Sequence, residues 1–196
     1  MCVILVCPPT VRPDRETIDA CHRQNPHGAG VAWREGGLVR WVKGLEPDEL
    51  EPLVNSLTGE IVIHFRWASV GEVTPKLCHP FPVTPSATTR LNGTARAVLF
   101  HNGTYGAWRD VMRRMPKGRI SDSLLSDSRV VASMVDYLGA DVLKSIHGKF
   151  VVFSNSSTKL YGYWEKFNGM KASNLYFAER VRTIALAQST LTFDEE

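Results

Sequence analysis

The sequence begins Met1-Cys2-Val3-Ile4-Leu5-Val6-Cys7, a cysteine directly behind the initiator methionine and then an apolar run. The run predicts a buried strand that ends at Pro8-Pro9, because proline cannot donate to a strand ladder. Methionine aminopeptidase removes Met1 when the second residue is small, which would leave Cys2 with a thiol and a free α-amino group. An amine with a pKa of roughly 7.7–8.0 could accept the thiol proton. Cys2 is therefore a candidate nucleophile with its own base, and the alternative is a buried apolar cysteine.

The composition indicates an ordinary globular protein. The 196 residues are 43% hydrophobic and 22% charged, which predicts a single domain over residues 1–196 with a sizeable core. A net charge of +3 is too small to argue for a nucleic-acid partner. Val3–Val6 is too short for a signal sequence or a membrane span. The four cysteines form no CxxC pair, so we expect a reducing, cytoplasmic location and no membrane partner.

Patterns along the chain predict many strands and a few helices. Trp33 and Trp41 flank a Gly36-Gly37 turn, which favours a hairpin. The proline-rich segment 71–85 is expected to be an irregular loop over a site. Further strands are predicted at 61–67, 97–100, 150–153, 160–164, 175–178 and 183–187, and helices at 15–23, 47–57, 108–115 and 126–138. This pattern predicts an α+β chain with more than one antiparallel sheet.

Polar residues with chemical potential stand at the ends of these elements. Arg66 ends an apolar strand, where a guanidinium can bind a carboxylate through two hydrogen bonds. Asn102 and Gly103 follow another strand and offer an amide and a backbone N–H, the donors of an oxyanion hole. Asp127 opens a predicted helix. The structural alternatives are an ion pair for Arg66, a type I′ turn for Asn102-Gly103 and an N-cap for Asp127.

Taken together and in order, these residues resemble the class II glutamine amidotransferase domain, a branch of the N-terminal nucleophile hydrolases. The resemblance covers most of the chain and rests on six motifs. They are Met1-Cys2, Asn25-Pro26-His27-Gly28-Ala29-Gly30, His64-Phe65-Arg66-Trp67-Ala68-Ser69, His79-Pro80-Phe81 with His101-Asn102-Gly103, and Ser126-Asp127-Ser128. The resemblance implies a four-layer αββα sandwich of two antiparallel sheets.

The resemblance also implies a role for each residue of the site. Cys2 would attack the side-chain amide of glutamine through a thioester, and Asn102 and Gly103 would form the oxyanion hole. Arg66 would hold the α-carboxylate and Asp127 the α-ammonium. Trp67, Ser69 and His101 would complete the substrate pocket. No cofactor and no metal are implied.

Several other interpretations stay open. Cys21-His22 and Cys78-His79 suggest zinc, although their spacing matches no common site. A basic cluster from Arg109 to Arg119 is a candidate nucleic-acid contact. A 196-residue chain leaves no room for a synthase domain, so we expect a stand-alone glutaminase that feeds ammonia to a separate synthase, for example one that modifies a nucleobase. The alternatives are an amidohydrolase of γ-glutamyl amides and a catalytically silent binding module.

Overall fold

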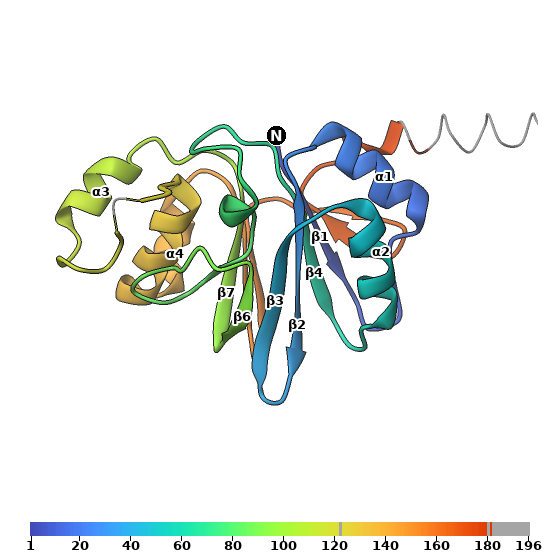
Figure 1. Ribbon diagram of the computed structural model, residues 1–196, viewed down its shortest axis with the longest axis horizontal. Coiled ribbons are helices and arrows are strands. Elements are labelled where there is room, and N and C mark those ends of the chain that lie inside the picture. Colours follow the sequence, from blue (N-terminus) through green and yellow to red (C-terminus); the bar gives the residue numbers. More distant parts are fainter. Residues whose placement is uncertain (122, 180, 182–196) are drawn as a thin grey trace, which may run out of the picture.

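The computed structural model describes residues 1–121, 123–179 and 181, and it contains two antiparallel sheets (Figure 1). The seven-stranded sheet has the order β10-β11-β1-β4-β2-β3-β6, and the four-stranded sheet has the order β5-β7-β8-β9. The strands of the larger sheet are β1 (Val3–Cys7), β2 (Ala29–Glu35), β3 (Leu38–Leu45), β4 (Ile61–Phe65), β6 (Asn92–Ala95), β10 (Glu165–Phe167) and β11 (Met170–Ala172). Those of the smaller sheet are β5 (Phe81–Pro82), β7 (Ala97–Asn102), β8 (Lys149–Ser154) and β9 (Thr158–Tyr161).

Helices cover the outer face of each sheet, which gives the predicted αββα layers (Figure 1). The helices α1 (Arg15–Gln24) and α2 (Pro47–Ser56) pack on the larger sheet. The helix α4 (Asp127–Leu138) packs on the smaller sheet, and α3 (Trp108–Arg114) lies beside it. Two short 3₁₀ helices, Pro75–Leu77 and Ala140–Ser145, lie in the connections. The prediction of an α+β four-layer sandwich is confirmed.

The strand β1 lies in the interior of the larger sheet, between β11 and β4. Side chains alternate across a strand. Val3, Leu5 and Cys7 therefore face the helices, while Ile4 and Val6 face the second sheet. Burial of both faces explains why this strand is a continuous apolar run in the sequence. The strand also fixes where the chain emerges, because Cys2 lies immediately before it.

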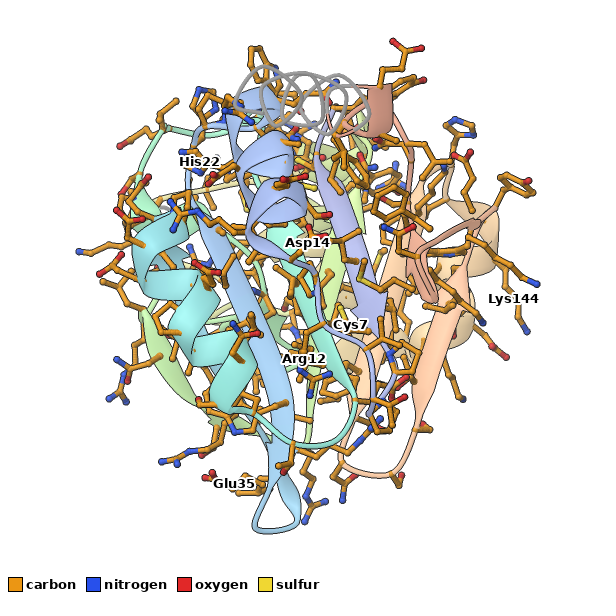
Figure 2. All side chains as sticks on the ribbon, turned by 90° about the vertical axis from the view of Figure 1, so that its right-hand side faces the viewer. Cys7, Arg12, Asp14, His22, Glu35 and Lys144 are labelled. Atoms are coloured by element: carbon orange, nitrogen blue, oxygen red, sulfur yellow. The ribbon has the colours of Figure 1, made fainter. Side chains whose placement is uncertain are left out.

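The connection between β1 and α1 is fastened by two side chains (Figure 2). Asp14 caps α1 by accepting a hydrogen bond from the Thr17 N–H at 2.8 Å. Arg12 donates to carbonyl groups at the end of α2, among them Val54 O at 3.0 Å and Leu57 O at 2.9 Å. These contacts attach the segment that follows β1 to α1 and α2. They therefore fix the C-terminal end of β1, opposite to the end that carries Cys2.

Most predicted elements are present, and one is wrong. Residues 175–178 do not form a strand; the chain turns there and Phe177 is buried against Phe167, with ring centroids 4.9 Å apart. The apolar pattern reflected this burial and not a ladder. The strands β6, β10 and β11 were not predicted, and the predicted strand at 183–187 lies outside the described residues. The segment 71–85 is irregular apart from Pro75–Leu77 and β5.

In the part of the chain that the structure describes, no helix combines the length and the hydropathy needed to cross a membrane. The single domain over residues 1–196 stays a prediction.

Candidate active site

Seven of the eight residues predicted for the site line one narrow cavity at the same edge of the two sheets, and Asn102 is the exception. Cys2 precedes β1, Arg66 follows β4, Gly103 follows β7, and Asp127 opens α4. The other lining residues are Trp67, Ala68, Ser69, Val70, Leu77, His79, His101, Ser126 and Ser128. The cavity measures about 20 Å³, which is room for roughly one water molecule. A substrate of amino-acid size therefore requires the cavity to widen.

The Cys2 thiol is held against the Trp67 backbone. Its Sγ lies 3.3 Å from the Trp67 N and 3.4 Å from the Trp67 O. Burial raises the pKa of the Cys2 thiol above its usual value, and the Trp67 hydrogen bond and the nearby Arg66 only partly oppose this. The thiol is therefore protonated at neutral pH. A nucleophilic Cys2 needs a base next to it.

Arg66 is a buried cation without an acidic partner. Its side chain is 3% exposed, and its guanidinium reaches only the carbonyl oxygens of Thr74 and Val70, at 3.5 and 3.4 Å. No salt bridge among the described residues includes it. Burial accordingly lowers the pKa of Arg66. Because a buried charge is costly when unpaired, this guanidinium is not explained by the structural ion pair considered from the sequence.

Asp127 is a buried anion on the other side of the cavity. Ser126 is the N-cap of α4, accepting from the Arg129 N–H, so the N-cap interpretation of Asp127 is wrong. The carboxylate of Asp127 instead accepts hydrogen bonds from the Tyr105 and Ser128 N–H groups, at 2.9 and 2.8 Å. The positive end of the helix dipole favours a negative charge at this position.

His101 does not neutralise Asp127. Its Nδ1 lies 3.9 Å from Asp127 Oδ2 and 3.0 Å from Ser128 Oγ. Burial lowers the pKa of His101 to about 4, although Asp127 opposes the shift. The imidazole is therefore neutral at pH 7, stacked on Phe150 with centroids 4.4 Å apart. Its Nε2 is buried and without a partner in the described structure.

Gly103 lines both this cavity and a larger cleft, while Asn102 lines only the cleft. Gly103 has φ of 155°, and a Cβ there would lie 2.9 Å from His101 Nε2, so only glycine fits. The Gly103 N–H makes no hydrogen bond with the described residues. Asn102 Nδ2 donates to Ser173 Oγ at 2.9 Å, while Asn102 Oδ1 is buried without a partner. The alternative of a type I′ turn at Asn102-Gly103 is wrong, because Asn102 is the last residue of β7.

Two residues that sequence reasoning missed position the start of the chain. Ser173 Oγ accepts from the Ile4 N–H at 2.9 Å as well as from Asn102, which joins β1 to the end of β7. Asn174 Nδ2 donates to the Cys2 carbonyl oxygen at 2.8 Å. Both follow β11, about 170 residues from Cys2 in the sequence, and only the strand pairing β1–β11 brings them close. The sequence offered no local signal for them, because β11 is only Met170-Lys171-Ala172 and was not predicted.

The Asn25–Gly30 motif supports Arg66 and Trp67 from behind. His27 Nδ1 accepts from the Ala68 N–H at 2.9 Å, and its ring stacks on Trp67. At Gly30, an added Cβ would lie only 1.9 Å from the His79 carbonyl oxygen, so glycine lets the His79 segment approach. The motif thus shapes the pocket wall, and its residues do not enter the cavity.

The remaining predicted residues lie as follows. Trp67 is 46% exposed at the mouth of the cavity, and Ser69 Oγ lies 3.0 Å from Thr104 Oγ1. In the basic cluster, Arg113 pairs with Asp110 and Arg119 with Asp136, while Arg109 lies over the Trp108 ring. Among the described residues, no three His, Cys, Asp or Glu side chains gather as metal ligands would.

The fold has known counterparts. Neither protein-family models nor curated protein sequences match this chain. Solved structures do match, and they show that the chain shares its fold with a glutamine amidotransferase. One is the glutamine phosphoribosylpyrophosphate amidotransferase from B. subtilis complexed with ADP and GMP (TM-score 0.56), and another is an allosteric regulatory enzyme of purine biosynthesis (TM-score 0.61). Each is 16% identical over 92% of this chain, which spans 43% of their length.

Proposed function

We propose that the protein hydrolyses the side-chain amide of glutamine through a thioester on Cys2. The observation that carries this proposal is a thiol in one cavity with two buried groups of opposite charge, Arg66 and Asp127, neither of which pairs with an ionised side chain among the described residues. An α-amino acid presents a carboxylate and an ammonium group. The carboxylate can pair with Arg66 and the ammonium group with Asp127. An amide that lacks one of these charges leaves a buried side chain unpaired.

The reaction follows from the thiol and the amine that Met1 removal would expose. The freed α-amino group of Cys2 takes the thiol proton, and Sγ attacks the γ-carbonyl carbon of glutamine. The C–N bond then breaks as the α-ammonium group returns that proton to the leaving ammonia. Water, deprotonated by the same amine, attacks the thioester and releases glutamate with the thiol restored.

Asn102 and Gly103 are the proposed donors to the oxyanion. Ser173 Oγ already accepts from Ile4 N, so its own proton is free to bond Asn102 Oδ1. If the Asn102 side-chain amide rotates by half a turn, Oδ1 accepts a hydrogen bond from the Ser173 hydroxyl. Nδ2 then occupies the position that Oδ1 has in this structure. With the Gly103 N–H, this supplies two donors to the developing charge.

Met1 has to be removed for this chemistry, because in its presence the Cys2 nitrogen is part of a peptide bond. Met1 is 63% exposed, so an aminopeptidase can reach it. We further propose that the protein works in the cytoplasm, where its four free cysteines stay reduced, and that a separate synthase accepts the ammonia, for example in nucleobase modification.

Replacement of Cys2 tests the proposed function. We expect the purified protein to release glutamate from glutamine, and Cys2→Ala to lower kcat/KM by at least about a thousandfold, because the nucleophile is lost. Cys21→Ala is the matched control, since Cys21 is buried on α1 outside the cavity and its loss should leave turnover intact. Glutamate release measured by a coupled assay decides. Equal rates for Cys2→Ala and the parent protein would end the proposal.

A further inference from the structure

Removal of Met1 leaves Cys2 as a terminal residue, and the chain then holds it from one side only. The first residues of a domain are poorly ordered unless other contacts tie them down. Proton transfer between the α-amino group and Sγ nevertheless requires the two groups within hydrogen-bond reach of each other. A contact from elsewhere in the fold therefore has to fix the orientation of Cys2.

Two contacts from distant segments hold Cys2. Its Sγ lies 3.3 Å from the Trp67 N, and its carbonyl oxygen accepts a hydrogen bond from Asn174 Nδ2 at 2.8 Å. The first contact fixes the Cβ branch, and the second fixes the carbonyl group. The amine is the remaining heavy-atom substituent on Cα, so its direction in an L-residue follows from the other two. Together the two contacts set the distance between the amine and Sγ.

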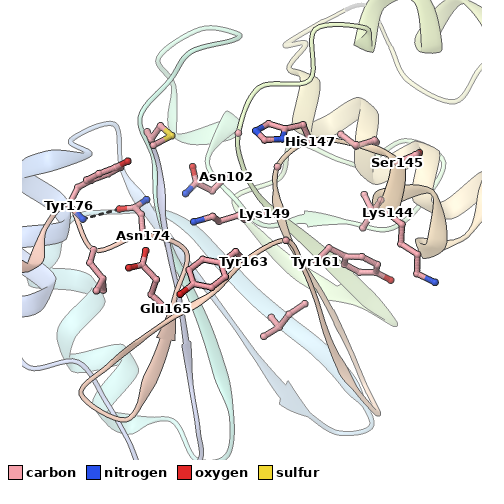
Figure 3. Close-up of a pocket in the computed structure, with 18 of the residues that line it drawn as sticks. Asn102, Lys144, Ser145, His147, Lys149, Tyr161, Tyr163, Glu165, Asn174 and Tyr176 are labelled. Carbon is pink, nitrogen blue, oxygen red and sulfur yellow. Dashed lines mark hydrogen bonds between the residues drawn. The ribbon is translucent and has the colours of Figure 1, made fainter.

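Asn174 is oriented for this contact. It is 4% exposed and lines the larger cleft, as Met1 does (Figure 3). Its Oδ1 accepts a hydrogen bond from the Tyr176 N–H at 3.3 Å, which is the dashed line in Figure 3. Because the oxygen of the amide is used in this way, the Nδ2 donor is directed to the Cys2 carbonyl group.

The Asn174 contact is not needed to join β11 to β1. The two strands already pair at Leu5 and Val6, and Ser173 Oγ accepts from the Ile4 N–H at 2.9 Å. What Asn174 adds is a bond to the residue that precedes β1. Asn174 does not line the catalytic cavity, so any effect on the reaction passes through Cys2.

We propose that Asn174 is a positioning residue for the N-terminal nucleophile, which keeps the freed α-amino group of Cys2 within reach of Sγ by holding the Cys2 carbonyl group. This inference rests on the proposed function, because it concerns the same amine and thiol. The amine takes the proton from Sγ and later returns it to the leaving ammonia. Both transfers depend on the orientation that Asn174 maintains.

Asn174→Ala tests this role in glutamine hydrolysis. Each protein is produced as a fusion that a protease cleaves directly before Cys2, and the intact mass verifies the free amine. We expect kcat to fall by about ten- to a hundredfold, since small misplacements of reacting groups have effects of this order. KM should stay within about twofold, because Arg66 and Asp127 remain in place. Asn174→Asp keeps the shape and the acceptor for the Tyr176 N–H but lacks the donor, so we expect the same losses.

Ser133→Ala is the matched control for the loss of a buried hydrogen bond. Ser133 on α4 is 0% exposed, and its Oγ donates to the Pro85 carbonyl oxygen at 2.6 Å, outside the catalytic cavity. This variant should lose stability and keep the kcat of the parent protein.

Alkylation of Cys2 by iodoacetamide separates positioning from a structural role and needs no glutamine. The reagent reacts with the thiolate. In the parent protein the amine takes the thiol proton, so the rate should rise through the pKa of an α-amino group, roughly 7.7–8.0. In Asn174→Ala this assistance is lost, while burial still raises the pKa of the thiol. The rate at pH 8 should then fall by about tenfold, and its rise should move to higher pH.

The two measurements distinguish this inference from the proposed function. A lower kcat with a shifted alkylation profile in both Asn174 variants supports the assignment. An unchanged kcat, or a lower kcat with the alkylation profile of the parent protein, overturns it and leaves the glutaminase standing. If the parent protein releases no glutamate from glutamine, the proposed function fails, and the alkylation profiles still decide whether Asn174 positions the amine.

Discussion

Arg66→Met is expected to abolish glutamine recognition without weakening the fold. Truncating one partner of a buried charge pair costs about 2–5 kcal/mol, so kcat/KM for glutamine should fall by about thirtyfold to several thousandfold. The free energy of unfolding should stay level or rise, because the guanidinium is buried without an acidic partner and methionine fills a similar volume. Steady-state kinetics and urea unfolding of the variant measure both effects.

A substrate without the α-carboxylate provides the matched control for Arg66. 4-Aminobutanamide keeps the amine and the amide but cannot bind the guanidinium, so Arg66→Met should reduce its slow turnover far less than that of glutamine. A structural ion pair predicts the reverse pattern, namely a variant that loses several kcal/mol of stability and discriminates between the two amides as before. That pattern would remove Arg66 from the substrate site.

Lys43→Met should stabilise the protein by about 2–4 kcal/mol at pH 7. Lys43 on β3 is 2% exposed, with Nζ over the Phe81 ring and 3.4 Å from the Pro80 carbonyl oxygen. Burial lowers the pKa of Lys43 from 10.5 to about 7, and each pKa unit corresponds to about 1.4 kcal/mol. The folded state thus loses stability by burying this amine, and methionine removes that loss.

The pH dependence identifies the cause. Between pH 7 and 10.5 the unfolded chain binds a proton at Lys43 that the folded chain does not, so the free energy of unfolding rises with pH. The variant lacks this contribution, so its advantage should shrink as the pH rises, by at most about 1.4 kcal/mol per pH unit, and should largely vanish by pH 10. Urea unfolding of both proteins at pH 7, 8.5 and 10 measures this, with the exposed Lys171→Met as control. A gain that is constant with pH would contradict the account.

The patterns in the sequence were sufficient for an α+β chain with more than one antiparallel sheet and for several residues of the site. The apolar run of β1 and the polar ends of β4 and β7 are local features, so the sequence alone indicates Cys2, Arg66, Asn102 and Gly103 as candidates. The resemblance to a known family added the order of the layers. Phe177 shows the limit of an apolar pattern, because burial in a turn produces the same signal as burial in a strand.

The rest depends on contacts between distant segments. Ser173 and Asn174 act on Cys2 and Asn102 only because β11 pairs with β1. Lys43 gave no sign of burial, since a lysine in an alternating strand is ordinarily exposed. The large cleft is formed by the connections around β8 to β11, which lie together only after both sheets have formed.

The intact mass of the purified protein, before and after 6-diazo-5-oxo-norleucine, tests the N-terminal nucleophile most directly. We predict a mass that lacks Met1, then a single adduct of this glutamine analogue that is absent in Cys2→Ala. The adduct requires the free thiol and the Arg66–Asp127 pocket together. A retained Met1, or a processed chain that takes no adduct, would contradict the account.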